Sequence, residues 1–466
     1  MIRSPLSFFP ASFRGRTLGA VAASGGFAKA CAVAAVLLVA SSAARGAETV
    51  KVDAEAAAAR IVQVSHAAAS SRARVSATAE TVRAADAAAL PSLTASAGIA
   101  RRSSVPEFRL PFVIPGQPPL VLFPDITTTY DASLQVQQAL YSGGAISGLR
   151  EATRHDSEAT SAGRAQTIAD LRLTAQLAYW EAVRASAGVD VARAQQDRAK
   201  RLLGDTRALL AAGMAVRADV LAAEERIATA EVQLIAAENA AQNARSQLAS
   251  LLHIEPPDDL ELADSLTGPL PAQPGPAAEL QTRALAKRPE LAATAAQLDA
   301  IRARERIAQA EARPTLGAVA QWDYSRPNQR YLPPVDAWKG SWSVGVVASW
   351  KLFDGGKAGA DTSASRFTQL AAQEDRLELE RRIRVEVDND RRNLESALAA
   401  VTAADAARAA GVEREKEARE RHAAGLAPMV EILDAEAQLA AAEEQQVNAR
   451  ASSWIAAAVL ARAVGQ

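Results

Sequence analysis

Two stretches of the sequence, LQVQQALYSGG at residues 134–144 and VVASWKLFDGG at residues 346–356, decide the fold. In each, apolar side chains alternate with small or polar ones, and this alternation predicts a β-strand with two different faces. A Gly-Gly pair then ends the alternation, and a long run of residues with helical spacing follows. Glycine suits such a joint because it has no Cβ to clash where the backbone turns from extended to helical. We therefore expect joints between a strand and a very long helix at Gly143, Gly144, Gly355 and Gly356.

The two halves of the chain repeat one order of elements. We expect a first repeat at residues 47–253 and a second at residues 277–466, with a linker rich in proline and aspartate at residues 254–276. Each repeat is predicted to contain a helix, two strands, a long helix and a shorter returning helix. The interval between the two Gly-Gly pairs equals that between Gly213 and Gly425. This ordered series indicates an internal structural duplication.

Four segments show the alternation expected of amphipathic strands. They lie at about residues 92–100, 128–141, 315–324 and 341–353. Each has the length of a transmembrane β-strand, and most tryptophans and tyrosines lie in or beside them. Aromatic side chains at the ends of apolar strands are typical of outer-membrane barrels. A Pro-rich loop is expected between the first two strands, from Val105 to Pro124.

Four strands are too few to close a barrel. An open sheet edge in lipid leaves backbone groups unpaired, so closure requires several copies of the chain. Three copies, with twelve strands, give the smallest barrel with an open lumen. The long helices cannot bury their apolar stripes within one slender subunit and are expected to pack beside copies of themselves. We therefore predict an α+β membrane protein in which a trimeric twelve-stranded β-barrel continues into a long helical tube.

The composition agrees with an exported, helix-rich chain. The formal net charge of −1 gives no reason to expect nucleic acid as a partner. The hydrophobic fraction of 49% comes largely from alanine, which favours long helices packed through small side chains. Residues 1–46 have the pattern of a signal peptide, and their apolar core is too short for a membrane anchor. The only cysteine, Cys31, lies in this segment, so we expect a mature chain without disulfides.

Several short motifs occur in the order typical of a known family. They are Arg288-Pro289-Glu290-Leu291, Ala312-Arg313-Pro314, Leu352-Phe353-Asp354-Gly355-Gly356, and Ala424-Gly425 followed by Glu431-Ile432-Leu433-Asp434-Ala435-Glu436. Together with the duplication, they resemble the TolC-like outer-membrane efflux proteins over essentially the whole mature chain. The first half departs from the pattern, because it lacks the Arg-Pro-Glu triplet.

The resemblance implies an assembly, a location and a function. The chain would form a homotrimer in the outer membrane of a Gram-negative cell, with a twelve-helix α-barrel as its large periplasmic portion. It would be the passive exit duct of a tripartite efflux pump, exporting small molecules such as drugs or metals. A periplasmic adaptor protein, an inner-membrane pump and outer-membrane lipid would be its partners. Gly213 and Gly425 would mark the tips of helix hairpins where the adaptor docks.

A periplasmic gate is also implied by the resemblance. The acidic ring of the family falls on Glu431 and Asp434, which share one side of a helix at i and i+3. Three copies would concentrate negative charge in a constriction and favour cations. Alternatively, both carboxylates serve only to stabilise a helix N-terminus. His422 and Asp219 fall where the family holds its closed gate, although an exposed pair of small consequence is the simpler interpretation.

The sequence is also compatible with two alternative functions, and none of the usual enzyme motifs is found in it. The same fold could serve as the outer-membrane component of a type I protein secretion system. A soluble periplasmic coiled-coil adaptor is a more remote alternative, because it leaves the amphipathic strands unexplained. The four histidines show no metal-ligand spacing, and no phosphate-loop or nucleophile motif appears. We therefore expect no catalytic residue, no metal and no cofactor.

Overall fold

The computed structural model describes residues 49–110, 119–255 and 259–466. Nearly all of them belong to one unit, Val50–Glu255 with Leu260–Gln466, which has a helix-dominated α+β fold. The expected signal peptide at residues 1–46 lies outside the described residues, as do parts of the Pro-rich loop and of the linker.

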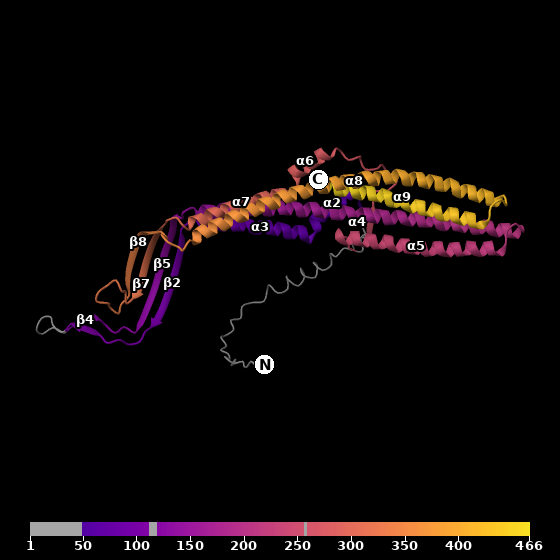
Figure 1. Ribbon diagram of the computed structural model, residues 1–466. Coiled ribbons are helices and arrows are strands. Elements are labelled where there is room, and N and C mark those ends of the chain that lie inside the picture. The colour runs from indigo at the N-terminus through magenta and orange to yellow at the C-terminus, as the bar shows by residue number, and fades with distance from the viewer. Residues whose placement is uncertain (1–48, 111–118, 256–258) are drawn as a thin grey trace, which may run out of the picture. The chain divides into compact units, whose positions relative to one another are not determined.

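The helices occur in two series of matching lengths. The first comprises α2 (Ala54–Val64), α3 (His66–Ala87), α4 (Ala145–Ala211) and α5 (Arg217–Leu251), with 11, 22, 67 and 35 residues. The second comprises α6 (Ala277–Lys287), α7 (Pro289–Ala310), α8 (Lys357–Ala423) and α9 (Met429–Ala463), with the same lengths in the same order. At 1.5 Å per residue, α4 and α8 are each about 100 Å long. α4 and α5 lie side by side as a first hairpin, and α8 and α9 as a second hairpin (Figure 1).

One extended residue separates the first two helices of each series. Ser65 lies between α2 and α3 with φ −66° and ψ 131°, and its hydroxyl accepts a hydrogen bond from the Ala67 N–H at the start of α3. Arg288 lies between α6 and α7 with φ −65° and ψ 124°. It is extended because the ring of Pro289 disfavours the helical conformation in the preceding residue. Helical spacing in the sequence continues through both breaks, so spacing alone does not predict them.

Four antiparallel strands form the main sheet. They are β2 (Ser92–Arg101), β5 (Thr128–Tyr141), β7 (Thr315–Arg326) and β8 (Lys339–Ser349), in the order β2-β5-β7-β8. β8 ends at Ser349, whereas the sequence predicted a strand that continues to Phe353. Ser349 pairs with Thr315, the first residue of β7, and Pro314 directly precedes Thr315. Proline has no N–H to extend the ladder, so the pairing stops there.

Two short sheets accompany the main one. β3 (Phe108–Leu110) and β4 (Leu120–Phe123) form a hairpin inside the segment that the sequence predicted to be only a loop. Phe108 and Phe123 lie opposite each other on it with their ring centroids 6.4 Å apart, a cross-strand aromatic pair that stabilises the pairing. The second short sheet pairs β1 (Thr49–Val52) with β6 (Asp259–Leu262).

The largest side chains of the helical core gather beside β1 and β6. Tyr179 is fully buried, and its hydroxyl accepts a hydrogen bond from the Asp264 N–H at 3.0 Å. The ring of Trp180 stacks on that of Trp454 with centroids 4.7 Å apart. Elsewhere more than half of the buried hydrophobic residues are alanine, and such small side chains let the long helices approach each other closely.

Candidate functional site

The register of the main sheet places apolar residues on one face of all four strands. Leu134 on β5 lies opposite Ala95 on β2 and Trp322 on β7, and Trp322 lies opposite Trp342 on β8. The large side chains on this face are exposed in the subunit: Leu93, Ile99, Leu134, Val136, Trp322, Tyr324, Trp342, Val344 and Val346. A contiguous apolar surface of this kind needs a covering environment.

The opposite face of the sheet is mainly polar. Ser133 on β5 lies opposite Ser96 on β2, and the two hydroxyls are 2.7 Å apart. On its other side Ser133 lies opposite Asp323 on β7. The two faces therefore suit different surroundings, one apolar and one aqueous.

Aromatic rings cluster at one end of the sheet. The rings of Trp322 and Tyr324 stack with centroids 5.9 Å apart, and the Tyr324 ring stacks on that of Trp338 at 5.0 Å. Tyr130 on the neighbouring strand lies 5.9 Å from Trp338. Such rings, with an apolar body and a polar edge, suit a boundary between lipid and water.

The outer strands of the sheet each pair on one side only. Within the described part of the chain, β2 pairs with β5 and β8 pairs with β7, and neither has a second neighbour. The subunit therefore presents two strand edges with unpaired backbone groups, and each edge can accept a strand of another chain.

Each expected joint contains two consecutive glycines, and all four of these glycines have left-handed backbone conformations. Their φ values are 66° and 105° at Gly143 and Gly144, and 71° and 89° at Gly355 and Gly356. A Cβ at Gly143 would lie only 2.9 Å from the Cβ of Arg313, so both backbone and packing require glycine there.

Side chains just before each Gly-Gly pair stabilise the start of the long helices. The Asp354 carboxylate accepts hydrogen bonds from the N–H groups of Gly356 and Ala358, both at 2.8 Å. In the first half the Ser142 hydroxyl accepts from the Ile146 N–H at 3.1 Å. Asp and Ser before a helix are the usual signal of such capping, and this role of Asp354 and Ser142 was not predicted from the sequence.

The hairpin tips are two copies of one turn. Gly213 and Gly425 both have φ 75°, and each follows the last helical turn as the left-handed residue. The Gly425 N–H donates to the His422 carbonyl at 2.9 Å, and the Leu426 N–H donates to the Arg421 carbonyl at 2.8 Å, a Schellman motif. The first tip has the same two bonds, at 3.0 and 2.9 Å. Exposed apolar side chains, Met214 and Leu426, follow the glycines.

The four expected gate residues lie near these tips, and each contacts its own hairpin. Glu431 accepts a hydrogen bond from Nη1 of Arg421 at 2.7 Å, and Asp434 accepts one from Gln438 at 2.7 Å. The Asp219 carboxylate accepts from the Val216 N–H at 3.1 Å at the start of α5.

His422 likewise bonds within its own hairpin. Its Nδ1 lies 2.8 Å from the Ala427 carbonyl oxygen. No hydrogen bond joins His422 to Asp219 within the described subunit, and each side chain is bonded instead to backbone of its own hairpin. Glu431 and Asp434 share one side of α9, as expected, but the charge of Glu431 is paired with Arg421.

A cluster that the sequence analysis did not identify surrounds the Arg-Pro-Glu motif. Arg288 is 3% exposed and binds Glu386 on α8 through two hydrogen bonds, at 2.7 and 2.6 Å. Arg462 on α9 binds Glu290 at 2.7 Å and Asp170 on α4 at 2.7 Å. The motif thus ties α4, α7, α8 and α9 together. Only its letters were visible in the sequence, because the partners lie far away along the chain.

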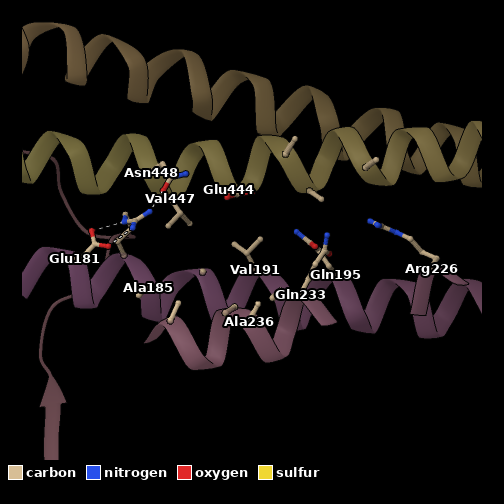
Figure 2. Close-up of a pocket in the computed structure, with 18 residues that line it drawn as sticks. Glu181, Ala185, Val191, Gln195, Arg226, Gln233, Ala236, Glu444, Val447 and Asn448 are labelled. Atoms are coloured by element: carbon tan, nitrogen blue, oxygen red, sulfur yellow. Dashed lines mark hydrogen bonds and ion pairs between the residues drawn. The ribbon is translucent and has the colours of Figure 1, made fainter. Parts of the chain in front are cut away.

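A cavity of about 540 Å³ opens between α4, α5 and α9 (Figure 2). Alanine is the commonest residue in its walls. Glu181 and Asn448 lie at one end and Arg226 at the other. Arg184 connects the first two, donating to Glu181 at 2.9 Å and to Asn448 at 2.9 Å, and its guanidinium lowers the pKa of Glu181. The cavity therefore has walls rich in small apolar side chains and a charged side chain at each end.

Two further features bear on function. No helix within the described ranges is long and apolar enough to cross a membrane. Among the residues with described positions, no group of three or more His, Cys, Asp or Glu side chains could hold a metal ion.

Comparisons with known proteins identify the family. Similar solved structures include the outer-membrane channel OprN (21% sequence identity, TM-score 0.71, covering 88% of this chain and 89% of that one). VceC from Vibrio cholerae (18%, 0.69, 88% and 96%) and the open state of MtrE from Neisseria gonorrhoeae (19%, 0.71, 88% and 88%) are also similar. Likeness at these identities establishes the fold. No curated protein matches the chain. The family model for outer membrane efflux proteins matches residues 57–252 and 280–466, so the chain belongs to the outer membrane efflux protein family.

Proposed function

We propose that the protein is the passive, trimeric exit duct of a tripartite efflux pump, located in the outer membrane with a large periplasmic portion. The observation that carries the proposal is the main sheet, which has one exposed apolar face, one polar face and two unpaired edges. In lipid, unpaired edges cost several kcal/mol for each backbone group, so the edges of β2 and β8 must be paired with other copies.

Three copies would close a twelve-stranded barrel whose apolar face meets lipid and whose polar face lines the lumen. α4, α5, α8 and α9 of each copy would then supply the twelve helices of a periplasmic tunnel. The matching lengths of the two helix series support an internal duplication, since each half contributes two strands and one hairpin.

The hairpin tips would be the docking points of a periplasmic adaptor that links the duct to an inner-membrane pump. Met214 and Leu426 offer exposed apolar side chains beside the two glycine turns. We propose Glu431, Asp434, Asp219 and His422 as the periplasmic gate. Glu431 and Asp434 would form an acidic ring that favours cations.

Small-molecule efflux is preferred to protein secretion as the function. The matching family is described as one of efflux proteins, and OprN and MtrE are described as outer-membrane channels. No feature of the described residues favours a protein cargo over a small one.

The decisive experiment is expression with an affinity tag in a Gram-negative host, followed by membrane fractionation and planar-bilayer recording. We expect outer-membrane recovery, a trimeric mass in detergent and cation-selective conductance. Replacing both Glu431 and Asp434 with Ala should lower the cation selectivity, with Asp299→Ala on the exposed surface of α7 as the control. A monomer in the osmotic-shock supernatant, or unchanged antibiotic susceptibility in a deletion strain that has lost a secreted protein, would contradict the proposal.

A further inference from the structure

Six charged side chains form a largely buried network between the first hairpin and the second hairpin. The members are Arg198 on α4, Arg226 on α5, Glu415 and Arg419 on α8, and Glu436 and Glu443 on α9. We call this set the hairpin network. Its three positive and three negative charges balance when all six groups are ionised, so any proton taken up changes the balance.

One contact in the hairpin network is tight. Arg198 donates to Glu443 through Nη2 at 2.6 Å and through Nη1 at 3.3 Å. The two side chains are 13% and 10% exposed. Paired hydrogen bonds between ionised groups in such a site resist separation, so this pair firmly joins α4 of the first hairpin to α9 of the second.

Glu436 is held less tightly although it is buried more deeply. Its side chain is 2% exposed, and the nearest charged atoms, Nε of Arg226 and Nη2 of Arg419, each lie 3.7 Å from a carboxylate oxygen. These distances are too long for hydrogen bonds, and Oε1 of Glu436 accepts none from any residue that the structure describes. Arg419 donates instead to Glu415.

The surroundings of Glu436 favour its protonated form. Burial raises the pKa of Glu436, and repulsion from Glu415 adds to the effect. The arginines that face it from α4, α5 and α8 lower the pKa, but by less than burial and Glu415 together raise it. A buried, ionised carboxylate without hydrogen bonds is therefore the least favourable member of the network.

We propose that Glu436 makes the packing of the two hairpins sensitive to protons: its protonated form favours the packed arrangement, and its ionised form favours separation of the hairpin ends. Separation would return the carboxylate to water, and Arg226 already lines the solvent-accessible cavity of Figure 2. The Arg198–Glu443 pair lies two helical turns farther from the tip, about 10 Å along α9, and would remain closed as the pivot.

Proton linkage sets the sign and the size of the effect. A carboxyl group whose pKa is raised in the packed arrangement binds its proton more tightly there than in a hydrated one. Raising the pH from the ordinary value of 4.5 through the raised value therefore favours separation. One linked proton changes the ratio of separated to packed hairpins by at most about tenfold per pH unit. The movement occurs within one subunit, so it does not depend on which cargo the duct carries.

The test measures the distance between the hairpin ends in the full-length protein in detergent. Spin labels would be placed at Met214→Cys and Leu426→Cys in a Cys31→Ser background, with labelled subunits diluted among unlabelled ones. Double electron–electron resonance between pH 5 and pH 8 should show a separated fraction that grows several-fold with pH. Glu436→Gln, which mimics the protonated form, should keep the fraction low and make it independent of pH.

Two further variants make the result specific. Glu444→Gln is the matched control: this exposed glutamate of α9 lines the same cavity but lies outside the hairpin network, so the variant should keep the pH dependence of the parent. Arg226→Met removes a cation that faces Glu436, and should increase the separated fraction at pH 8 several-fold. The proposal is overturned if the parent distances do not change with pH, or if Glu436→Gln retains the parent's pH dependence. A separated fraction that Arg226→Met leaves unchanged would also overturn it.

Discussion

The contact between Arg288 and Glu386 yields a prediction in which the two partners are not equivalent. Arg288 is 3% exposed, whereas Glu386 is 43% exposed and also lies 3.6 Å from Arg462. Glu386→Ala would leave a buried guanidinium without its two hydrogen bonds. Removing one partner of a buried ion pair costs about 3–5 kcal/mol, and we expect the lower end because Asp390 is close enough to interact with Arg288.

Removing the arginine should cost less. Arg288→Met keeps the apolar stem of the side chain and leaves Glu386 able to bind water and Arg462. Only the net value of the hydrogen bonds is then lost, about 1–2 kcal/mol. Arg288→Met should therefore be more stable than Glu386→Ala by about 1–2 kcal/mol.

Urea unfolding followed by the helical circular dichroism signal, in detergent at pH 7, measures both variants. The change in the free energy of unfolding is the midpoint shift multiplied by the slope, provided that the slope is unchanged. Asp299→Ala, which breaks the exposed pair with Arg302, is the control and should change the free energy of unfolding by less than about 1 kcal/mol. If Arg288→Met destabilises the protein as much as Glu386→Ala does, the buried cation does not determine the cost.

Three other predictions use the same unfolding assay. Gly425→Ala should cost about 1 kcal/mol because an alanine must adopt φ 75°. Gly163→Ala, inside α4 where an added Cβ would meet no atom within 4 Å, should instead stabilise the protein by up to about 1 kcal/mol. If both variants changed the free energy of unfolding by the same amount, the backbone conformation of Gly425 would not explain the cost of its replacement. Tyr179→Phe should cost about 1–3 kcal/mol because the Asp264 N–H loses its acceptor, and a neutral result would mean that water replaces the hydroxyl. Hydrogen bonds from a glutamine and an arginine on α9 hold the pKa of Asp405 below its ordinary value of 3.8, so its contribution is present above that value and is lost as the pH falls through the lowered pKa. Asp405→Asn should flatten the acid side of the stability profile between about pH 2 and pH 5, and an unaltered profile would assign that loss to other groups.

Local patterns in the sequence were sufficient for some features and insufficient for others. Period-two alternation depends only on neighbouring residues, and the register of the sheet places the alternating residues Leu134 and Trp322 on one face. The end of β8 depends on its partner strand, because pairing stops opposite Thr315 and Pro314. An alternation pattern contains no information about the neighbour, so the predicted strand was too long.

Long-range ion pairs were beyond prediction for a related reason. Arg462 binds Asp170, which lies 292 residues away along the chain. The sequence contains 52 Lys and Arg and 53 Asp and Glu, so many pairings are conceivable and spacing alone selects none of them. For the proposed gate, helical periodicity indicated that Glu431 and Asp434 share one side of α9, but it could not show that Arg421 neutralises Glu431.

The early end of β8 has a mechanical consequence. Trp350, Leu352 and Phe353 follow the last paired residue, and Phe353 is 88% exposed. Beyond the ladder the side chains need not alternate between two faces, and the Trp350 Nε1–H donates to the Ala312 carbonyl at 3.1 Å. In the proposed membrane setting, Leu352 and Phe353 can extend beside Trp350 into the headgroup region as a short apolar collar. In the proposed setting such a collar sets how deeply the sheet lies in the membrane, because moving the duct inward or outward would expose large apolar side chains to water. A pump that pulls on the periplasmic end would therefore exert force on this collar, and the proposed trimer would have three copies of it.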